Sequence, residues 1–132
     1  MSLTPLPQLG SVVWAELEDA NGFRKVRPVV VVTATADIAA GKLVRVVAIT
    51  TRLLTPLPND YVLLPWDPQG KGRSGLRRWC AAVASWQSVI PVGDVQQVIG
   101  ILPPAVLGEL LAKAAVVLSP PSAPPADVPK QP

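Results

Sequence analysis

The sequence predicts a mainly β (α+β) protein, a small and partly open β-barrel with one C-terminal α-helix packed across it. Valine-rich runs recur along the first two-thirds of the chain, and β-branched residues pack well on a pleated surface. Several short strand patterns precede the only long helical pattern. Hydrophobic residues make up 49% of the 132 residues and charged residues 16%, so the chain can bury a single core.

The first strand is expected at residues 11–17, where apolar residues alternate. Val12, Trp14 and Glu16 should face one side of the sheet, and the odd-numbered residues the other. Residues 18–22 then form a turn, because Asn-Gly is a strong hairpin signal.

Two nearly continuous β-branched strands follow at residues 26–33 and 43–50, as expected for strands buried on both faces. Pro28 lacks an N–H, so it should lie at the start of its strand or on an edge. Between the two strands, one helical turn is expected, capped by Thr35 and closed by Gly41.

The remaining pattern predicts strands at residues 61–64, 76–86 and 95–101. A polar, glycine-rich and basic loop occupies residues 67–75. Apolar residues at helical spacing predict a helix at residues 103–118, which two prolines then end.

The chain divides into an N-terminal arm (1–9), one barrel domain (10–118) and a disordered tail (119–132) that contains six prolines. The start shows no signal-peptide pattern. Apolar stretches fall short of the roughly 20 residues that span a membrane. We therefore expect a soluble, cytoplasmic protein without membrane association.

The composition excludes several chemistries. Histidine is absent and Cys80 is the only cysteine, so a disulfide within the chain, a Cys/His zinc site and Ser–His–Asp or Cys–His catalysis are excluded. No metal or cofactor is expected. The net charge of +3 is compatible with nucleic acid as a partner.

Four segments resemble, in the same order, those of the MazF/PemK-type toxins of type II toxin–antitoxin systems. They are the opening strand at residues 10–17, the Arg-Pro-Val strand at 26–32, the strand at 46–51 that ends on two threonines, and residues 98–103 before the helix. The resemblance covers about residues 10–118 and identifies the chain as a divergent member of that family.

The resemblance implies an SH3-like barrel of the CcdB/PemK/MazF fold, usually a homodimer. It also implies metal-free, sequence-selective cleavage of single-stranded RNA, blocked by a cognate antitoxin. Arg27 would be the catalytic arginine and Thr50 its hydroxyl partner.

The residue chemistry fits this implication. In metal-free cleavage the RNA 2′-OH attacks the adjacent phosphate, and an arginine fork can bind the phosphate oxygens in bidentate fashion. Arginine stays protonated, so the candidates for the general base are Glu16, Glu18 and Asp19, with Glu18 preferred. Alternatively, Arg27 pairs with Glu16 or Asp19 across the hairpin and has no catalytic role.

Further residues are candidates for RNA binding because they are basic or lie at the end of the third strand. They are Arg24, Lys25, Thr51, Arg52, Lys71, Arg73, Arg77 and Arg78. Trp79 or Trp86 could stack on a base. For Trp14 and Trp86, a place in the core or a dimer interface is the preferred interpretation.

Two segments depart from the family. The loop at residues 20–25 lacks the usual glutamate and glutamine, and residues 80–87 carry no charge. An alternative is therefore a non-catalytic RNA- or protein-binding barrel of the same fold. A CcdB-type gyrase poison is a weaker alternative, because that activity depends on the end of the chain, which is a proline-rich tail here.

Overall fold

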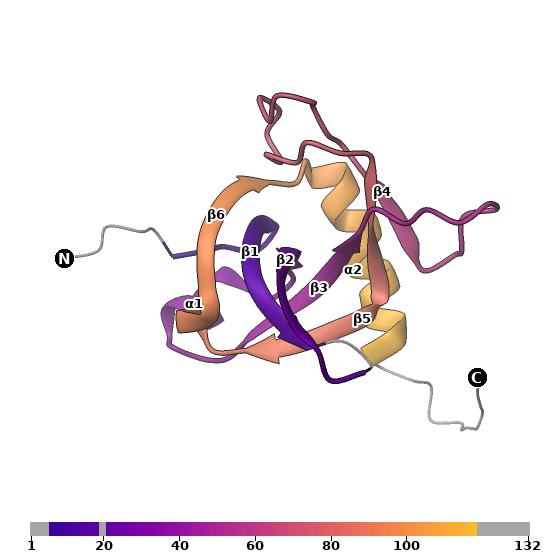
Figure 1. Cartoon of the computed structure of the whole chain (residues 1–132). Helices are drawn as coiled ribbons and strands as arrows, with labels where there is room; N and C mark the ends of the chain where they lie inside the picture. Colours follow the sequence, from indigo (N-terminus) through magenta and orange to yellow (C-terminus); the bar gives the residue numbers. More distant parts are fainter. Residues whose placement is uncertain (1–5, 19–20, 119–132) are drawn as a thin grey trace, which may run out of the picture.

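The computed structural model describes residues 6–18 and 21–118, which form a six-stranded antiparallel open sheet with a C-terminal helix (Figure 1). The strand order is β4-β5-β3-β2-β1-β6. This confirms the predicted mainly β fold. The elements are β1 (Ser11–Glu18), β2 (Arg24–Val31), α1 (Thr35–Ala39), β3 (Val44–Thr50), β4 (Tyr61–Leu64), β5 (Cys80–Ile90), the 3-10 turn η1 (Val92–Asp94), β6 (Val95–Ile101) and α2 (Pro104–Leu118).

Some predictions concern residues outside the described ranges. Most of the N-terminal arm, the disordered tail at 119–132 and the candidate base Asp19 fall there. Within the described ranges, no helix is long and apolar enough to cross a membrane.

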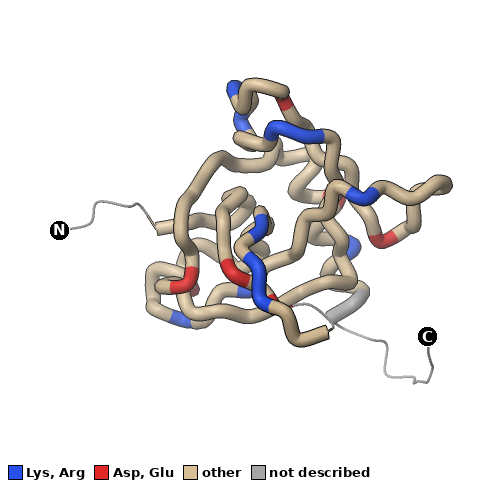
Figure 2. The backbone as a smooth tube through the Cα atoms, viewed as in Figure 1, with Lys and Arg blue, Asp and Glu red and all other residues tan. Residues whose placement is uncertain are grey.

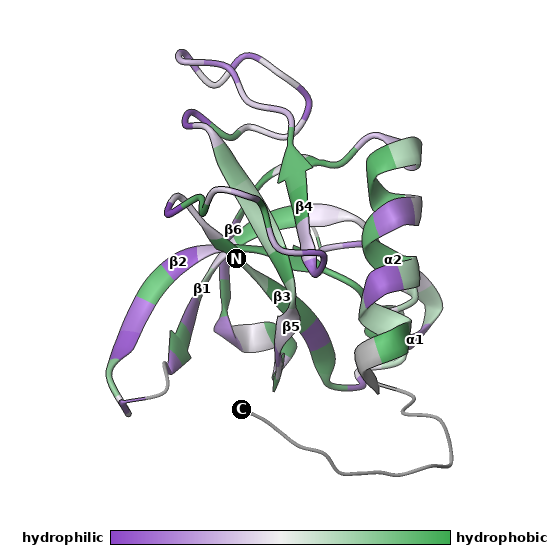
Figure 3. Cartoon of the chain, turned by 90° about the vertical axis from the view of Figure 1, so that its right-hand side faces the viewer, coloured by the Kyte–Doolittle hydropathy of each residue, from purple (hydrophilic) through white to green (hydrophobic). Residues whose placement is uncertain are grey.

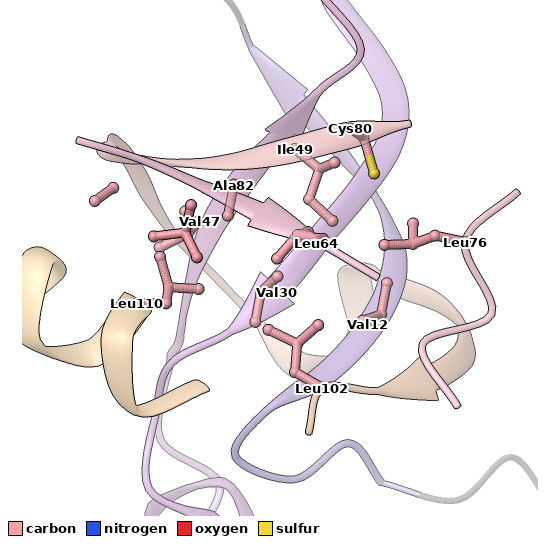
Figure 4. Packing of buried hydrophobic residues seen from close by; sticks show 12 residues of the cluster. Val12, Val30, Val47, Ile49, Leu64, Leu76, Cys80, Ala82, Leu102 and Leu110 are labelled. Atoms are coloured by element: carbon pink, nitrogen blue, oxygen red, sulfur yellow. The ribbon is translucent and has the colours of Figure 1, made fainter. Parts of the chain in front are cut away.

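The sheet buries an apolar cluster on each face, as the β-branched runs predict. The first strand alternates as expected: Val12 belongs to one cluster, and Val13, Ala15 and Leu17 to the other. We call the two faces the α2-side face and the α1-side face. The α2-side cluster (Figure 4) is Val12, Val30, Val47, Ile49, Val62, Leu64, Leu76, Cys80, Ala82, Ala84, Leu102 and Leu110. The α1-side cluster is Val13, Ala15, Leu17, Val29, Val31, Ile38, Val44, Val46, Ala48 and Ile90.

Figure 3 shows long apolar stretches along β3 and β4 and an alternation of apolar and polar residues along α2. Leu110 of α2 is completely buried against the sheet. The predicted amphipathic helix therefore packs across the barrel through its apolar face.

The predicted boundaries of the fifth strand were wrong by four residues at each end. Residues 76–79 belong to the preceding loop, where the Leu76 carbonyl accepts a hydrogen bond from the Asp67 amide. The strand instead continues to Ile90, because its second half pairs with the start of β3. Its first half pairs with β4 and the end of β3, and a bulge separates the halves. Pairing partners, rather than local propensity, set these ends.

Pro28 lies in the middle of β2, yet at a place where one side of the strand is open. Strand β2 pairs with β1 from Arg24 onward, whereas its pairing with β3 is limited to Val29–Val31. The missing N–H of Pro28 therefore costs no ladder hydrogen bond to β3. Strand β2 is an interior strand, but at Pro28 it is paired on one side only, so the predicted edge position holds for this stretch of the strand.

Thr35 does not cap α1, contrary to the prediction. The N-cap residue is Ala34, without a side-chain capping bond. The Thr35 hydroxyl instead accepts a hydrogen bond from the Leu9 amide at 3.0 Å. It thereby ties the segment before β1 to the helix. Gly41 follows the turn with a φ of +80°, as predicted for a helix-ending glycine.

The edge strand β6 pairs irregularly with β1. The register shifts between Val12 and Val13 and again between Trp14 and Ala15. Each shift is a β-bulge on β6, because one β6 residue is left without a partner at each of them: Ile99 at the first and Gln96 at the second. The two bulges change which β6 side chains reach the α2-side face.

Candidate functional site

Arg27 stacks on an aromatic ring. Its guanidinium carbon lies 4.8 Å from the centroid of the Trp86 ring, within the range of a cation–π interaction. The buried Nε has no hydrogen-bond partner among the described residues, and no ion pair with Arg27 is formed there. The guanidinium of Arg27 therefore has no neutralising carboxylate in the described part of the chain.

The Glu16 ion pair considered for Arg27 is formed by Arg24 instead, and the alternative partner Asp19 lies outside the described residues. Arg24 lies 3.3 Å from Glu16 and 3.8 Å from Glu18, counted between nitrogen and oxygen atoms. Strand alternation explains the choice, because Arg24, Glu16 and Glu18 all project to the α2-side face while Arg27 projects to the other. Both pairs are about half exposed, so each contributes little to stability.

Thr50 lies on the same face as Arg27, beyond the point where β2 and β3 part. The last paired residues are Val29 and Ala48, and the same register extended by two residues places Arg27 opposite Thr50. The Thr50 hydroxyl accepts a hydrogen bond from the Arg52 amide at 3.1 Å. Its own proton can still be donated. The two residues predicted as catalytic therefore lie on one face of the sheet and on adjacent strands, each two residues beyond the last β2–β3 pair.

Glu18 is separated from this pair. It ends β1 on the α2-side face, exposed and beside Arg24. Lys25, in contrast, alternates with Arg27 and shares its face, where it is exposed.

The opposite, α2-side face carries a groove of about 760 Å³. Three of the predicted RNA-binding residues, Thr51, Arg77 and Arg78, line it. Its other lining residues are mostly apolar or glycine, and none of them is acidic: Trp14, Pro28, Ile49, Gly70, Gly75, Leu76, Cys80, Gln97, Val98 and Ile99. The groove is thus an apolar trough with two cations at its wall.

Three neighbouring strands contribute the floor of the groove in one cross-strand row. Trp14 of β1 is paired with Pro28 of β2 on one side and with Gln97 of β6 on the other. Sequence reasoning preferred a place in the core or an interface for Trp14 and did not select Gln97. Trp14 is only partly buried and Gln97 is exposed. The strand register and the bulges of β6 create this row, and no local pattern encodes them.

The loop that carries Arg77 and Arg78 is held by its own polar groups. The Asp67 carboxylate accepts hydrogen bonds from the amides of Gln69 (2.9 Å) and Lys71 (3.0 Å). The buried Ser74 hydroxyl donates to the Pro65 carbonyl at 2.8 Å and accepts from the Leu76 amide at 3.2 Å. The loop therefore has a defined shape despite its glycine content.

Two glycines let this loop press against β6. A Cβ on Gly75 would lie 2.2 Å from the Ile99 carbonyl oxygen, and one on Gly100 would lie 2.2 Å from that of Arg73. The Ile101 amide donates to the same Arg73 carbonyl at 2.8 Å. Only glycine permits so close an approach of two backbones, so the loop is fixed to the strand that forms one side of the groove.

The other predicted RNA-binding residues lie around these two regions. Figure 2 shows basic positions on the loop between β4 and β5 and along β2. Lys71 and Arg73 are exposed on that loop, and Arg52 is exposed just after β3. Trp79 beside them is 61% exposed, which suits the predicted stacking role.

Neither a cysteine nucleophile nor a clustered metal site is found in the described residues. Cys80 lines the groove, but burial raises the pKa of its thiol from 9.0 to about 11, so it stays protonated at neutral pH. The described part of the chain holds no group of three or more Cys, Asp or Glu side chains placed to bind a metal ion.

Comparison with known proteins places the chain among toxins. A family model for the PemK-like, MazF-like toxin of type II toxin–antitoxin systems matches residues 8–118. No curated protein matches the chain in sequence.

Solved structures of such toxins share the fold. MazF (Form-I) from Deinococcus radiodurans is 19% identical, with a TM-score of 0.68 over 87% of this chain and 98% of that one. An endoribonuclease in complex with its cognate antitoxin from Mycobacterial species is 20% identical, with a TM-score of 0.67 over 87% and 97%. The Mycobacterium tuberculosis toxin MazF-mt6 is 21% identical, with a TM-score of 0.63 over 83% and 96%.

Proposed function

The chain belongs to the PemK-like, MazF-like toxin family of type II toxin–antitoxin systems, and from this premise we propose that it is a toxin that cleaves single-stranded RNA. The proposed reaction is sequence-selective and needs no metal or other cofactor. A cognate antitoxin neutralises the protein, which acts in the cytoplasm as a homodimer. Solved endoribonucleases and MazE–MazF complexes with the same fold support the proposal.

One observation carries the catalytic part of the proposal: Arg27 is held over Trp86 without an anionic partner in the described residues. A stacked guanidinium keeps its fork of N–H donors directed in its own plane. A scissile phosphate placed there would meet a fixed, un-neutralised cation. Fixed charges of this kind act where negative charge develops in the transition state.

In the proposed mechanism the 2′-OH of the RNA attacks the adjacent phosphorus, and the 5′-oxygen of the next nucleotide leaves. Arg27 binds the two non-bridging oxygens, and the Thr50 hydroxyl donates a hydrogen bond to one of them. The proton of the 2′-OH passes to solvent water and the departing 5′-oxygen takes one from water, so that the products are a 2′,3′-cyclic phosphate and a free 5′-hydroxyl end. Removal of one such donor typically lowers the rate about 10²–10³-fold.

Glu18 does not fit this geometry as the proton acceptor. It projects to the α2-side face with Arg24, whereas the proposed phosphate lies on the other face. Glu18→Gln is therefore expected to retain the cleavage rate of the wild type, measured as initial rate on the same RNA. If Glu18→Gln lowered the cleavage rate as much as Arg27→Ala, Glu18 would be the proton acceptor after all.

The test is cleavage of a long mixed-sequence RNA by purified protein with EDTA present, followed by mapping of the fragment ends. We expect discrete cuts that leave 2′,3′-cyclic phosphates and are lost in Arg27→Ala and Thr50→Ala. Lys42→Ala is the matched control, because it removes an exposed cation that pairs with Asp37 instead.

Intact RNA after incubation with folded wild-type protein would refute the nuclease. The non-catalytic RNA- or protein-binding barrel would then be favoured, in agreement with the uncharged strand β5. Addition of the protein to purified gyrase, with DNA supercoiling as the readout, would distinguish that outcome from a gyrase poison.

A further inference from the structure

We propose that the groove on the α2-side face is a nucleotide-binding subsite that takes a base of the RNA next to the cleaved bond. The base lies on Trp14 and Pro28, Gln97 reads its edge, and Arg77 and Arg78 bind its phosphate. This inference rests on the proposed function and concerns the opposite face of the sheet from Arg27.

The lining of the groove selects the class of ligand. Its floor is apolar and includes an aromatic ring, while its wall carries two arginines and no carboxylate. A ligand that satisfies both parts has a flat, weakly polar portion and an anionic portion. A nucleotide of single-stranded RNA has this composition, because unpaired bases stack on aromatic rings and phosphates pair with arginine.

The cross-strand row gives the base a place to lie and a group to read it. Trp14 stands between Pro28 and Gln97 in adjacent strands. The partly buried indole offers a face for stacking. The exposed Gln97 amide carries both a donor and an acceptor, which suffices to distinguish base edges by paired hydrogen bonds.

Both arginines are open to an anion, because neither forms an ion pair with a described residue. Arg77 packs over Gly70, where its Nε would lie 3.0 Å from an added Cβ. The only carboxylate of the loop, Asp67, accepts hydrogen bonds from backbone amides. It is therefore turned to the backbone, away from neutralising Arg77 and Arg78. The close contact of Gly75 and Gly100 with the facing backbones holds the loop in this position.

The end of β3 connects the groove to the proposed cleavage site. Thr50 belongs to the α1-side face with Arg27, whereas the next residue, Thr51, lines the groove. An RNA strand that crosses this end of the sheet can place a phosphate at Thr50 and a neighbouring nucleotide at Thr51. The subsite thus contributes to the choice of sequence around the cut.

The test compares Gln97→Ala with Gln96→Ala, since both side chains are exposed neighbours on β6 and only Gln97 lines the groove. Cut sites are mapped on a mixed-sequence RNA by sequencing of fragment ends. We expect Gln97→Ala to relax the preference at one position beside the cut by roughly 10–100-fold, with other positions unchanged. Gln96→Ala should keep the wild-type pattern.

Binding is measured separately in the Arg27→Ala background, by fluorescence anisotropy of a labelled mixed-sequence oligoribonucleotide. Introduction of Arg77→Ala into the Arg27→Ala protein is expected to weaken RNA binding. It should also reduce the magnitude of the slope of log binding constant against log salt concentration by about 0.7, as for the loss of one phosphate contact in a single strand. This readout does not need cleavage, so it tests the groove even if the proposed nuclease activity fails.

Three results would overturn the inference. The Gln97→Ala and Gln96→Ala cut patterns could be identical in an active enzyme, or Arg77→Ala could leave RNA affinity and its salt dependence unchanged. In the third result, Gln97→Ala and Arg77→Ala keep the wild-type cut pattern and RNA affinity but lose affinity for the purified antitoxin, which would make the groove a protein-binding site.

Discussion

Replacement of Gly100 by alanine is expected to destabilise the protein strongly, although the residue is small and has no positive φ. The added Cβ would lie 2.2 Å from the Arg73 carbonyl oxygen and 2.3 Å from the Ser74 carbonyl carbon, whereas ordinary contacts begin at 3.4 Å. The loop backbone would thus have to retreat by about 1.2 Å (3.4 minus 2.2).

The cost has two parts. Overpacking of a tightly fitted site typically costs about 1–3 kcal/mol. The retreat would also break the hydrogen bond from the Ile101 amide to the Arg73 carbonyl, which contributes roughly 1 kcal/mol. The sum is roughly 2–4 kcal/mol, a large part of the 5–15 kcal/mol that typically stabilises a domain.

Urea unfolding followed by tryptophan fluorescence measures this change. Gly93→Ala is the matched control, because nothing lies within 4 Å of its added Cβ, and we expect its free energy of unfolding to stay within about 0.5 kcal/mol of the wild type. Equal stabilities of the two variants would refute the argument that the loop is clamped to β6. A Gly100→Ala protein that still folds should also bind RNA more weakly, since its loop carries Arg77 and Arg78.

Three other predictions follow from the described contacts. Trp86→Leu removes the ring beneath Arg27 and should lower the cleavage rate constant roughly 2–30-fold with little change in RNA affinity. Trp86→Phe should retain most of the wild-type rate constant. Equal effects of Trp86→Leu on rate and affinity in single-turnover kinetics would contradict a positioning role. Leu110→Ala should cost about 2–5 kcal/mol in urea unfolding because the side chain is fully buried, whereas the 72%-exposed Val116 should tolerate alanine; similar costs would argue against α2 packing on the sheet. Burial raises the pKa of the Cys80 thiol to about 11, so an unfolded chain releases the thiol proton from about pH 9 while the folded protein holds it. The free energy of unfolding of the wild type relative to Cys80→Ala should therefore be constant below about pH 9 and fall between about pH 9 and 11. A constant difference across that range would show an accessible thiol.

The sequence was most informative where the structure depends on local pattern. Alternation along residues 11–17 predicted correctly that Val12 and Val13 enter different clusters, because a strand sends successive side chains to opposite faces. The helix was found for the same kind of reason, since apolar spacing encodes its buried face. Both signals are contained within one element.

Features that depend on pairing between elements were missed. Trp86 meets Arg27 only because a bulge in β5 interrupts its pairing with β3. Likewise, Gln97 lies opposite Trp14 because of the bulge of β6 between Val12 and Val13. Bulges follow from the fit of neighbouring strands, so a single segment of sequence does not reveal them. Glu16 and Glu18 are both even-numbered residues of β1 and therefore lie on the opposite face from Arg27, which neither residue's local sequence reveals.

The irregular pairing of β6 also bears on whether further chains can add to the sheet at its edges. An open sheet has two outer strands, and a regular outer strand offers a row of free N–H and C=O groups on which another chain can add. Here one outer strand, β4, has only four residues, and the other, β6, is broken by two bulges. Neither edge offers a long regular ladder, so the same bulges that shape the groove should suppress edge-to-edge aggregation of a valine-rich sheet.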